Sequence, residues 1–469
     1  MRQFCVFVRY VAAAFVVLVF SASLAKAQTQ LSSELRQKID KLVLEVLEKT
    51  GTPSASLAVV KDGQIVYVQA YGNARLEPPT PAKVEMRYCL ASLSKPFTAA
   101  ALLLLQEQGK LSVDDKVSKF LPELTRSGEV TIRQLLSHTS GYREFWPVDY
   151  VLPMMLQPAT PRQIVDQFAR KPLSFDPGTK WEISDTNYVI AGMIVEKVSG
   201  KPLYQFLQEK IFKPLSMDGT ADVDHEKPGT AGPAGYMRYG IGPLRIAPHE
   251  AQGWLFGGEL LAMTAGDLGR WDVSVLEQTL LKPSSYRDLE TDVLLKNGFA
   301  TRNALGSGIT WQSGRRALYT IGDISGFSAA NTIFLDDRVA VAVLTNLDAG
   351  APSEIIRGVA ALMLAKEDPD APRRLELARR IFEDLQHGTI DRSLFTGNGN
   401  SYFSEAALQD FAASLAPLGK PRDFVQAERS IGSGLTTRTY KIKFAGRTLA
   451  VRATESSEGK LEQFMIESE

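Results

Sequence analysis

The 469-residue sequence is poor in residue types on which many protein functions depend. It contains two cysteines and four histidines, and its 53 basic residues balance its 53 acidic ones. A net charge of zero gives no electrostatic case for nucleic acid or an anionic membrane as a partner, because both favour a basic surface. The histidines show no metal-ligand spacing, so the sequence predicts neither a metal site nor another cofactor.

A long apolar run lies at the N-terminus. Arg2 and Arg9 precede an apolar core from Tyr10 to Phe20, and Ala25-Lys26-Ala27 follows as a cleavage signal. This core is well short of the roughly 20 residues that a membrane-spanning helix needs. We therefore expect residues 1–27 to be a cleaved signal peptide, which predicts a secreted or periplasmic protein with no stable membrane span after cleavage.

Cysteine cannot stabilise the mature chain. Cleavage would remove Cys5 and leave Cys89 alone, so no internal disulfide can form. Stability must then come from a hydrophobic core, for which a 44% hydrophobic composition suffices. Cys89 precedes an apolar run, a position typical of a small buried hydrophobic residue rather than a nucleophile.

Strand patterns lie near both ends of the first 365 residues. Segments 56–61 and 64–72 are rich in β-branched and aromatic residues and flank Asp62-Gly63, a hairpin signal. Segments 331–335 and 339–346 flank a similar polar turn, and most periodic segments between the two ends are helical. This segregation predicts an α+β fold in which early and late strands share one antiparallel sheet and the helices form a second lobe.

A charged, proline-punctuated stretch at residues 366–372 predicts a linker. Beyond it, we expect a helix around 375–385, a second helix with Ser404 as its N-cap, and a strand over 439–444. These elements predict a separate small α+β domain at 373–469, of unknown role.

Ser92 and Lys95 stand three positions apart at the expected start of a helix. The same spacing occurs at Ser23 and at Ser457, so it carries no information by itself. Pro96 is tolerated in the first turn of a helix, which places the helix start close to Ser92. There, free N–H groups can stabilise an oxyanion, and Lys95 shares the helical face of Ser92. The pair is therefore a candidate nucleophile and base for acyl transfer, the alternative being a helix cap beside a solvated lysine.

Longer segments accompany this pair in a fixed order. They are LASLSKPFTAAALLLL around Ser92, TIRQLLSHTSGY from Thr131, DPGTKWEISDTNYVIAGMIVEKVSGKPL from Asp176, GDLGRWDVSVL from Gly266 and SGFSAANTIFLDDRVAVAVLTN from Ser325. Together they resemble the class C β-lactamase-related serine hydrolases, a family that includes penicillin-binding proteins, D-amino-acid peptidases and esterases. The resemblance covers about residues 33–365 and implies a β-lactamase/penicillin-binding-protein-like domain at 28–365. It also implies that Ser92 is the acylated nucleophile and Lys95 its partner.

Two departures from the family pattern fall at the expected site. Ile183-Ser184-Asp185 stands where the family usually has Tyr-x-Asn, so the tyrosine expected to assist proton transfer is an isoleucine. Thr320-Ile321-Gly322 stands where the family usually has Lys-Thr-Gly or His-x-Gly, so the cation is absent. We take Asp185, Thr320 and Gly322 as candidate substrate-binding residues. Loss of a positioned acid or base lowers the rate by roughly 10²–10⁴.

Other residues near these motifs are weaker candidates. His138 lies in a segment that is structural in the family, and Tyr188 is expected to pack rather than to replace the lost phenol. Residues 256–263, FGGELLAM, resemble a loop that borders the family's pocket, the alternative being a tight turn at Gly257-Gly258.

The resemblance and its departures support two functional hypotheses. The first is an exported serine hydrolase that acts on an amide or ester, in a small molecule or a peptide, as an esterase, a peptidase or a β-lactamase-like enzyme. Lys95 would be the base if it is neutral, although a carboxylate at Asp185 opposes this. The N–H of Ser92 and one from the strand near Gly322 would form the oxyanion hole. The second is a weakened or inactive member that binds or regulates, its C-terminal domain contacting an unknown partner.

Overall fold

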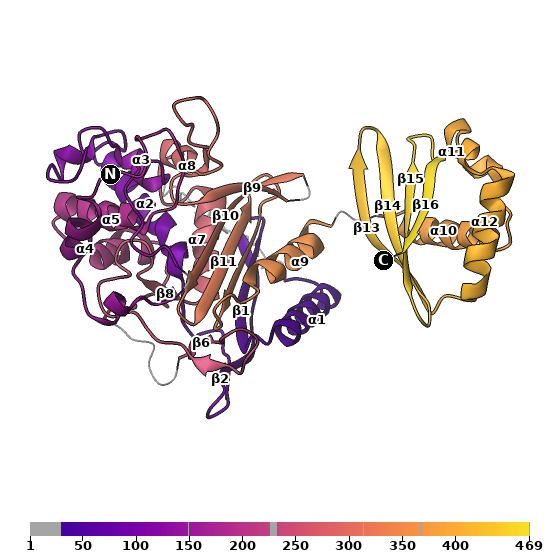
Figure 1. Cartoon of the computed structure of the whole chain (residues 1–469), viewed down its shortest axis with the longest axis horizontal. Helices are drawn as coiled ribbons and strands as arrows, with labels where there is room; N and C mark the ends of the chain where they lie inside the picture. Colours follow the sequence, from indigo (N-terminus) through magenta and orange to yellow (C-terminus); the bar gives the residue numbers. More distant parts are fainter. Residues whose placement is uncertain (1–29, 149, 226–231, 313, 366–367, 469) are drawn as a thin grey trace, which may run out of the picture. The chain divides into compact units, whose positions relative to one another are not determined.

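The computed structural model describes residues 30–148, 150–225, 232–312, 314–365 and 368–468. The expected signal peptide, residues 1–27, lies outside these ranges. The chain divides into two compact units, residues 1–365 and 366–469 (Figure 1). Within the described ranges, no helix is both long and apolar enough to cross a membrane.

The first unit is built on a seven-stranded antiparallel sheet with the order β3-β2-β1-β12-β11-β10-β9. The strands are β1 (Ser54–Lys61), β2 (Gln64–Arg75), β3 (Thr80–Pro81), β9 (Gly308–Gln312), β10 (Arg315–Ile324), β11 (Phe327–Phe334) and β12 (Val339–Thr345). The early strand β1 pairs with the late strand β12, and Leu57 lies opposite Val343. The predicted pairing of early and late strands in one sheet is therefore confirmed.

Helices cover both faces of this sheet. The α-helices described in the first unit are α1 (Ser33–Thr50), α2 (Lys95–Glu107), α3 (Ile132–Leu136), α4 (Pro161–Phe168), α5 (Asp185–Ser199), α6 (Leu203–Leu207), α7 (Ala265–Glu277), α8 (Pro283–Glu290) and α9 (Pro352–Leu364). Of these, α1 and α9 pack on one face of the sheet and α7 packs on the other. Side chains of a strand alternate between faces, so Leu57 and Val59 pack with α1 and α9 while Ala58 and Val60 join the larger core with α7. Gly269 of α7 faces Ala58, which lets helix and sheet approach closely.

The helical lobe centres on α2, which packs against α5 (Figure 1). The ring of Phe97 in α2 lies 4.7 Å from that of Trp271 in α7 and joins the lobe to the sheet. A 3₁₀ turn, η1 (Ala91–Ser94), leads into α2 and packs against β10. The start of α2, the start of α5 and the strand β10 therefore meet at one place.

Smaller strands complete this unit. They are β4 (Tyr88–Cys89), β5 (Ala221–Asp222) and β8 (Leu261–Met263), which form one short sheet, and β6 (Tyr236–Met237) and β7 (Arg245–Ile246), which form another. Strand β8 lies between β4 and β5, so the segment that follows residue 260 is tied to the strand that precedes Ser92. This pairing holds the loop 256–260 near η1.

The second unit contains a four-stranded antiparallel sheet with three helices and a core of its own. Its elements are β13 (Asp423–Gly432), β14 (Leu435–Lys443), β15 (Thr448–Glu455), β16 (Leu461–Ser468), α10 (Ala371–Gln386), α11 (Gly397–Tyr402) and α12 (Glu405–Leu415). Ser404 caps α12 by accepting from the N–H of Ala407 at 3.2 Å. Helix α10 begins inside the expected linker 366–372, because Pro372 occupies its first turn, where proline is tolerated.

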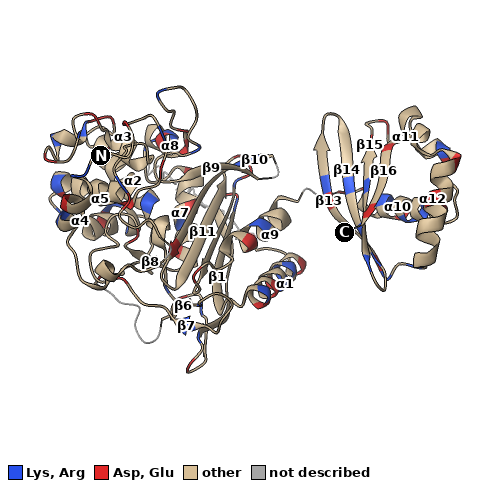
Figure 2. Ribbon diagram, in the orientation of Figure 1, with Lys and Arg blue, Asp and Glu red and all other residues tan. Residues whose placement is uncertain are grey.

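Charged side chains of both signs are interspersed on the exposed helices. Helix α1 shows this clearly, because both basic and acidic side chains occur along its length (Figure 2). An example is the pair of Lys38 and Glu34, whose charged atoms lie 2.7 Å apart. The mixture matches the net charge of zero, and exposed pairs of this kind contribute little to stability because solvent screens them.

Because each unit has its own core, we expect trypsin to cut after Lys366 and to release a folded fragment that ends there. Arg374, within α10 and paired with Glu455, should be protected in the same digest. Mass spectrometry of the fragments, with circular dichroism of the purified larger one, checks this. Loss of structure in both fragments after cleavage would show that the units form one cooperative fold.

Candidate active site

Ser92 and Lys95 lie together where η1 meets α2. Lys95 is the first residue of α2 and is 3% exposed, and its Nζ lies 2.5 Å from Ser92 Oγ. Ser92 itself is partly exposed, so solvent reaches the serine while the lysine is buried. Ala91, just before it, has a positive φ of 49°, a strained conformation that tends to occur at functional sites. The structure thus joins the two residues that the sequence singled out.

Carboxylates surround Lys95. Its Nζ lies 2.8 Å from Asp185 Oδ1 and 3.7 Å from Glu259 Oε1. Glu144 accepts a hydrogen bond from the backbone N–H of Asp185 at 2.5 Å. Burial alone would lower the pKa of Lys95, but the carboxylates of Asp185 and Glu259 outweigh it and raise that pKa above its ordinary value. Lys95 is therefore an ammonium at neutral pH.

More carboxyl groups than cations lie around Lys95, and protonation of some of these carboxyl groups reduces the excess negative charge. Burial, followed by the charge of Asp185, raises the pKa of Glu259 well above its ordinary value. The same two causes raise the pKa of Glu144 to about 7. Both groups therefore retain a proton at pH values where an exposed glutamate has lost it.

Glu259 also contacts the serine. Its Oε1 accepts a hydrogen bond from Ser92 Oγ at 3.3 Å, and the residue is 5% exposed. Its second oxygen, Oε2, has no hydrogen-bond partner among the residues that the structure describes. The sequence analysis identified the loop at 256–263 but missed this carboxylate. The available signal was an acidic residue within an apolar run, since glutamate is rarely buried without a specific role.

Strand β10 lies directly against the backbone of Ser92. A Cβ atom at Gly322 would stand 2.7 Å from Ser92 N and 2.5 Å from the carbonyl oxygen of Leu90. The backbone segments expected to form the oxyanion hole are therefore neighbours. Thr320, two residues earlier, has its Oγ1 3.3 Å from Ser307 Oγ. It supplies a hydroxyl where the family pattern has a cation.

Neither Ile183 nor Tyr188 supplies a phenol to the site in the family's manner. Ile183 is 51% exposed and carries no acid–base group. The hydroxyl of Tyr188 donates to the carbonyl of Leu136 at 2.9 Å, and burial raises the pKa of this phenol above its usual value. The expectation that Tyr188 packs is confirmed.

The surroundings of His138 and Cys89 indicate that both residues support the fold and do not take part in catalysis. His138 Nδ1 accepts from the N–H of Ser184 at 3.1 Å, and burial, followed by the charge of Lys95, lowers the pKa of His138 to about 3. Its ring is therefore neutral. Burial raises the pKa of the Cys89 thiol to about 12, so it stays protonated and unreactive, as expected.

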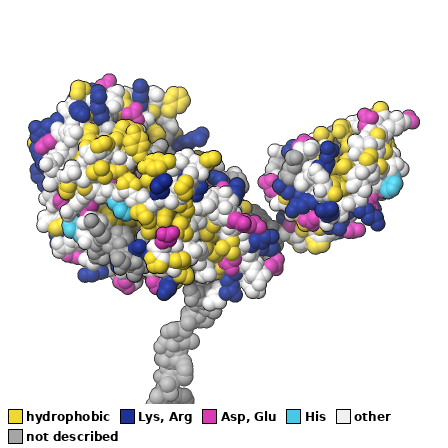
Figure 3. Space-filling model, turned by 60° about the horizontal axis from the view of Figure 1, so that its bottom comes forward, with side chains coloured by type: hydrophobic (Ala, Val, Ile, Leu, Met, Phe, Trp, Pro, Cys, Tyr) yellow, Lys and Arg dark blue, Asp and Glu magenta, His cyan; other side chains and the backbone are white. Residues whose placement is uncertain are grey.

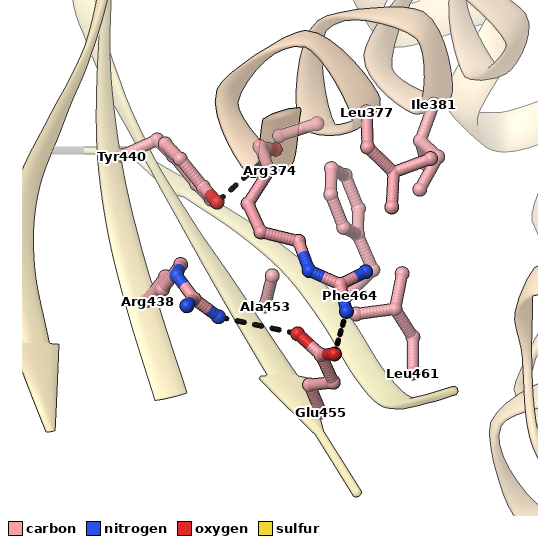
Figure 4. A pocket seen from close by; sticks show the side chains of 10 residues that line it. Arg374, Leu377, Ile381, Arg438, Tyr440, Ala453, Glu455, Leu461 and Phe464 are labelled. Atoms are coloured by element: carbon pink, nitrogen blue, oxygen red, sulfur yellow. Dashed lines mark hydrogen bonds and ion pairs between the residues drawn. The ribbon is translucent and has the colours of Figure 1, made fainter. Parts of the chain in front are cut away.

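The second unit holds a small pocket between α10 and the sheet (Figure 4). Its polar side chains are bonded to one another: Arg438 Nη1 lies 3.1 Å from Glu455 Oε2, and Arg374 pairs with the other oxygen of Glu455. The hydroxyl of Tyr440 donates to the carbonyl of Arg374 at 3.3 Å. These contacts stabilise the domain and offer no nucleophile, so the candidate active site is the one at Ser92.

Comparisons with known proteins identify relatives in sequence and in fold. A family model described as Beta-lactamase matches residues 39–366. Penicillin-binding protein 4* of Bacillus subtilis is 27% identical over 410 residues, which are 82% of this chain and 86% of that protein. The structure of the octameric penicillin-binding protein homologue from Pyrococcus abyssi is 22% identical with a TM-score of 0.61, covering 92% of this chain and 95% of that one.

A second solved structure has a similar fold over most of this chain. The D-amino acid amidase from Ochrobactrum anthropi SV3, complexed with D-phenylalanine, is 23% identical with a TM-score of 0.63 and covers 71% of this chain and 99% of that one. The family model spans well over half of the chain. Together with the pair of Ser92 and Lys95 at the start of α2, this match shows that the chain belongs to the beta-lactamase family.

Proposed function

We propose that the protein is an exported serine hydrolase that forms an acyl-enzyme on Ser92 and cleaves an amide or an ester. The observation that carries this proposal is the 2.5 Å contact between Lys95 Nζ and Ser92 Oγ at the start of α2. It places a cation beside the oxygen that becomes negative when the serine loses its proton, which stabilises the nucleophilic form. The backbone around Ser92 and Gly322 would stabilise the oxyanion of the substrate.

The relatives and the surface narrow the class of substrate. A penicillin-binding protein and a D-amino acid amidase among the similar proteins favour an amide, including a lactam or a D-amino acid derivative. Trp181 and Ile183, shortly before Asp185, are 42% and 51% exposed. Hydrophobic side chains also gather on one face of the first unit (Figure 3). We therefore expect a substrate with an apolar group near the bond that is cleaved.

A second candidate function is binding without turnover. Ile183 in place of the tyrosine and Thr320 in place of the cation favour it, because each removes a group that the family uses in catalysis. In that case the site around Ser92 would bind a ligand without cleaving it, and the second unit would contact a partner. Covalent labelling distinguishes the two functions, since a binding protein forms no acyl-enzyme.

Replacement of Ser92 tests the nucleophile. Ser92→Ala should abolish labelling by a fluorophosphonate or penicillin probe and hydrolysis of simple aryl esters, because it removes the attacking oxygen. Ser457→Ala, at an exposed serine with the same spacing to a lysine, should change neither. Ester hydrolysis that persists in Ser92→Ala would exclude Ser92 as the nucleophile. A wild-type protein that no acylating probe labels would favour the binding function.

Gly322 tests the oxyanion hole. In Gly322→Ala, the new Cβ would stand 2.7 Å from Ser92 N and force the strand and η1 apart. Loss of one oxyanion donor lowers kcat by roughly 10²–10³. We therefore expect kcat for ester hydrolysis to decrease by at least this factor in Gly322→Ala. Gly432→Ala, in strand β13 with nothing near its Cβ, is the matched control and should be neutral. Unchanged kinetics in Gly322→Ala would contradict the role of this strand.

Export is tested at the N-terminus. Cleavage after Ala27 predicts that the mature protein in the extracellular or periplasmic fraction begins at or near Gln28. N-terminal sequencing or intact mass measurement of that fraction gives the answer. A mature protein that retains Met1 would contradict the signal peptide.

A further inference from the structure

A charged Lys95 cannot take the proton of Ser92. An ammonium has three N–H donors and no lone pair, and the carboxylates around Lys95 keep it in this form. The 2.5 Å contact is therefore a hydrogen bond that Lys95 donates to Ser92 Oγ. The hydroxyl hydrogen of Ser92 must point to a different acceptor, and that acceptor is the candidate base.

Glu259 occupies the position of that acceptor. Its Oε1 lies 3.3 Å from Ser92 Oγ and 3.7 Å from Lys95 Nζ, so the three groups form a triangle. We propose that Glu259 is the general base for Ser92 and takes over the proton transfer that the missing tyrosine would have assisted. This inference rests on the proposed function of Ser92 as the nucleophile.

The loop that carries Glu259 is fixed to the nucleophile's own element. Thr98 Oγ1 donates to the carbonyl of Gly257 at 2.6 Å, and Ser94 Oγ accepts from the N–H of Leu261 at 3.2 Å. Gly257 has a φ of 84°, and a Cβ there would stand 2.2 Å from the carbonyl oxygen of Tyr188, so glycine is required for this approach. The bonds from η1 and α2 lie on either side of Glu259 and set its distance from Ser92.

In each half-reaction, Glu259 accepts one proton and then donates it. As Ser92 Oγ bonds to the carbonyl carbon of the substrate, its proton passes to Glu259 and the carbonyl electron pair moves onto the oxygen. Collapse of this intermediate breaks the bond to the leaving nitrogen or oxygen, which takes the proton from Glu259. In deacylation, water gives a proton to Glu259 while its oxygen attacks the acyl carbon. Ser92 Oγ then leaves and recovers that proton. Lys95 stays charged throughout and stabilises the serine oxygen.

The charges that face Glu259 determine the pH at which it can act. They are the side chains of Lys95, Asp185, Glu144 and Glu250, and burial with the negative charges outweighs the single cation. The pKa of Glu259 is consequently raised, so the carboxylate form appears only as the pH rises above the range of an ordinary glutamate. We expect activity to increase with pH through this titration and to be lost on its acid side, where Glu259 holds a proton.

The test compares Glu259→Gln with the wild-type protein from acid to alkaline pH. The readouts are the labelling rate with a fluorophosphonate and kcat for an aryl ester. Glutamine keeps the shape but cannot accept a proton, so we expect both rates to fall by roughly 10²–10⁴ and the rise with pH to disappear. Glu259→Asp should keep the rise at a lower rate. Glu250→Gln, which removes a nearby carboxylate that does not contact Ser92, should retain the wild-type maximal rate.

Chemical rescue separates catalysis from support of the fold. Sodium formate should raise the rate of Glu259→Ala, because a small carboxylate can enter the vacated space and accept the proton. Thermal unfolding of each variant confirms that it is folded. A Glu259→Gln protein with the wild-type rate and pH profile would overturn this inference. If Ser92 is still labelled in that protein, the proposed function is unaffected. A wild-type protein without Ser92 labelling at any pH would overturn the proposed function and this inference with it.

Discussion

The rest of the site depends on the buried ammonium of Lys95. A buried charge is costly unless it is paired, and Asp185 provides the pairing at 2.8 Å. One cation balances one carboxylate, so further buried acids must hold protons or share them. Glu144 and Glu259 are those acids, and the raised pKa of each follows from burial together with the charge of Asp185. The same charge balance that retains Lys95 as a cation thus raises the pH at which Glu259, beside Ser92, becomes a carboxylate that can accept a proton.

The charged groups of this site are brought together by tertiary structure, because they are far apart in the sequence. Lys95 begins α2, Asp185 begins α5, and Glu259 lies on the loop before β8. These elements meet because α2 and α5 pack together in the helical lobe and β8 pairs with β4, the strand just before η1. Strand β10 closes the remaining side at Gly322. The glycines at 257 and 322 are needed because backbone or nucleophile atoms occupy the space of a side chain.

Sequence patterns predict the sheet and the position of Ser92, but they cannot predict the contact between Ser92 and Glu259. Hairpin signals predict that β1 pairs with β2 and β11 with β12, and the segregation of strands from helices predicts that these early and late strands share one sheet. The position of Ser92 follows from Pro96, which is tolerated only near a helix start. The contact of Glu259 with Ser92 has no such signature, because it joins residues 167 positions apart through loop geometry. The start of α10 is also not predictable. Pro372 is compatible with a linker, as predicted, and with the first turn of a helix, as found, and only packing of the domain decides between them.

The first departure from the family pattern, at residues 183–185, changes two side chains, and these two changes have a common physical consequence. With isoleucine at 183, Ser92 lacks the phenol that the family pattern provides to assist proton transfer. The carboxylate of Asp185 keeps Lys95 charged, so the lysine cannot accept the proton instead. With a neutral amide at 185, burial would act on Lys95 with less opposition and favour its neutral, basic form. Asp185 therefore commits Lys95 to the role of a cation. A chain that keeps Ser92 reactive under this constraint needs an acceptor other than lysine or tyrosine, and the one buried oxygen acid in contact with the serine within the described residues is Glu259.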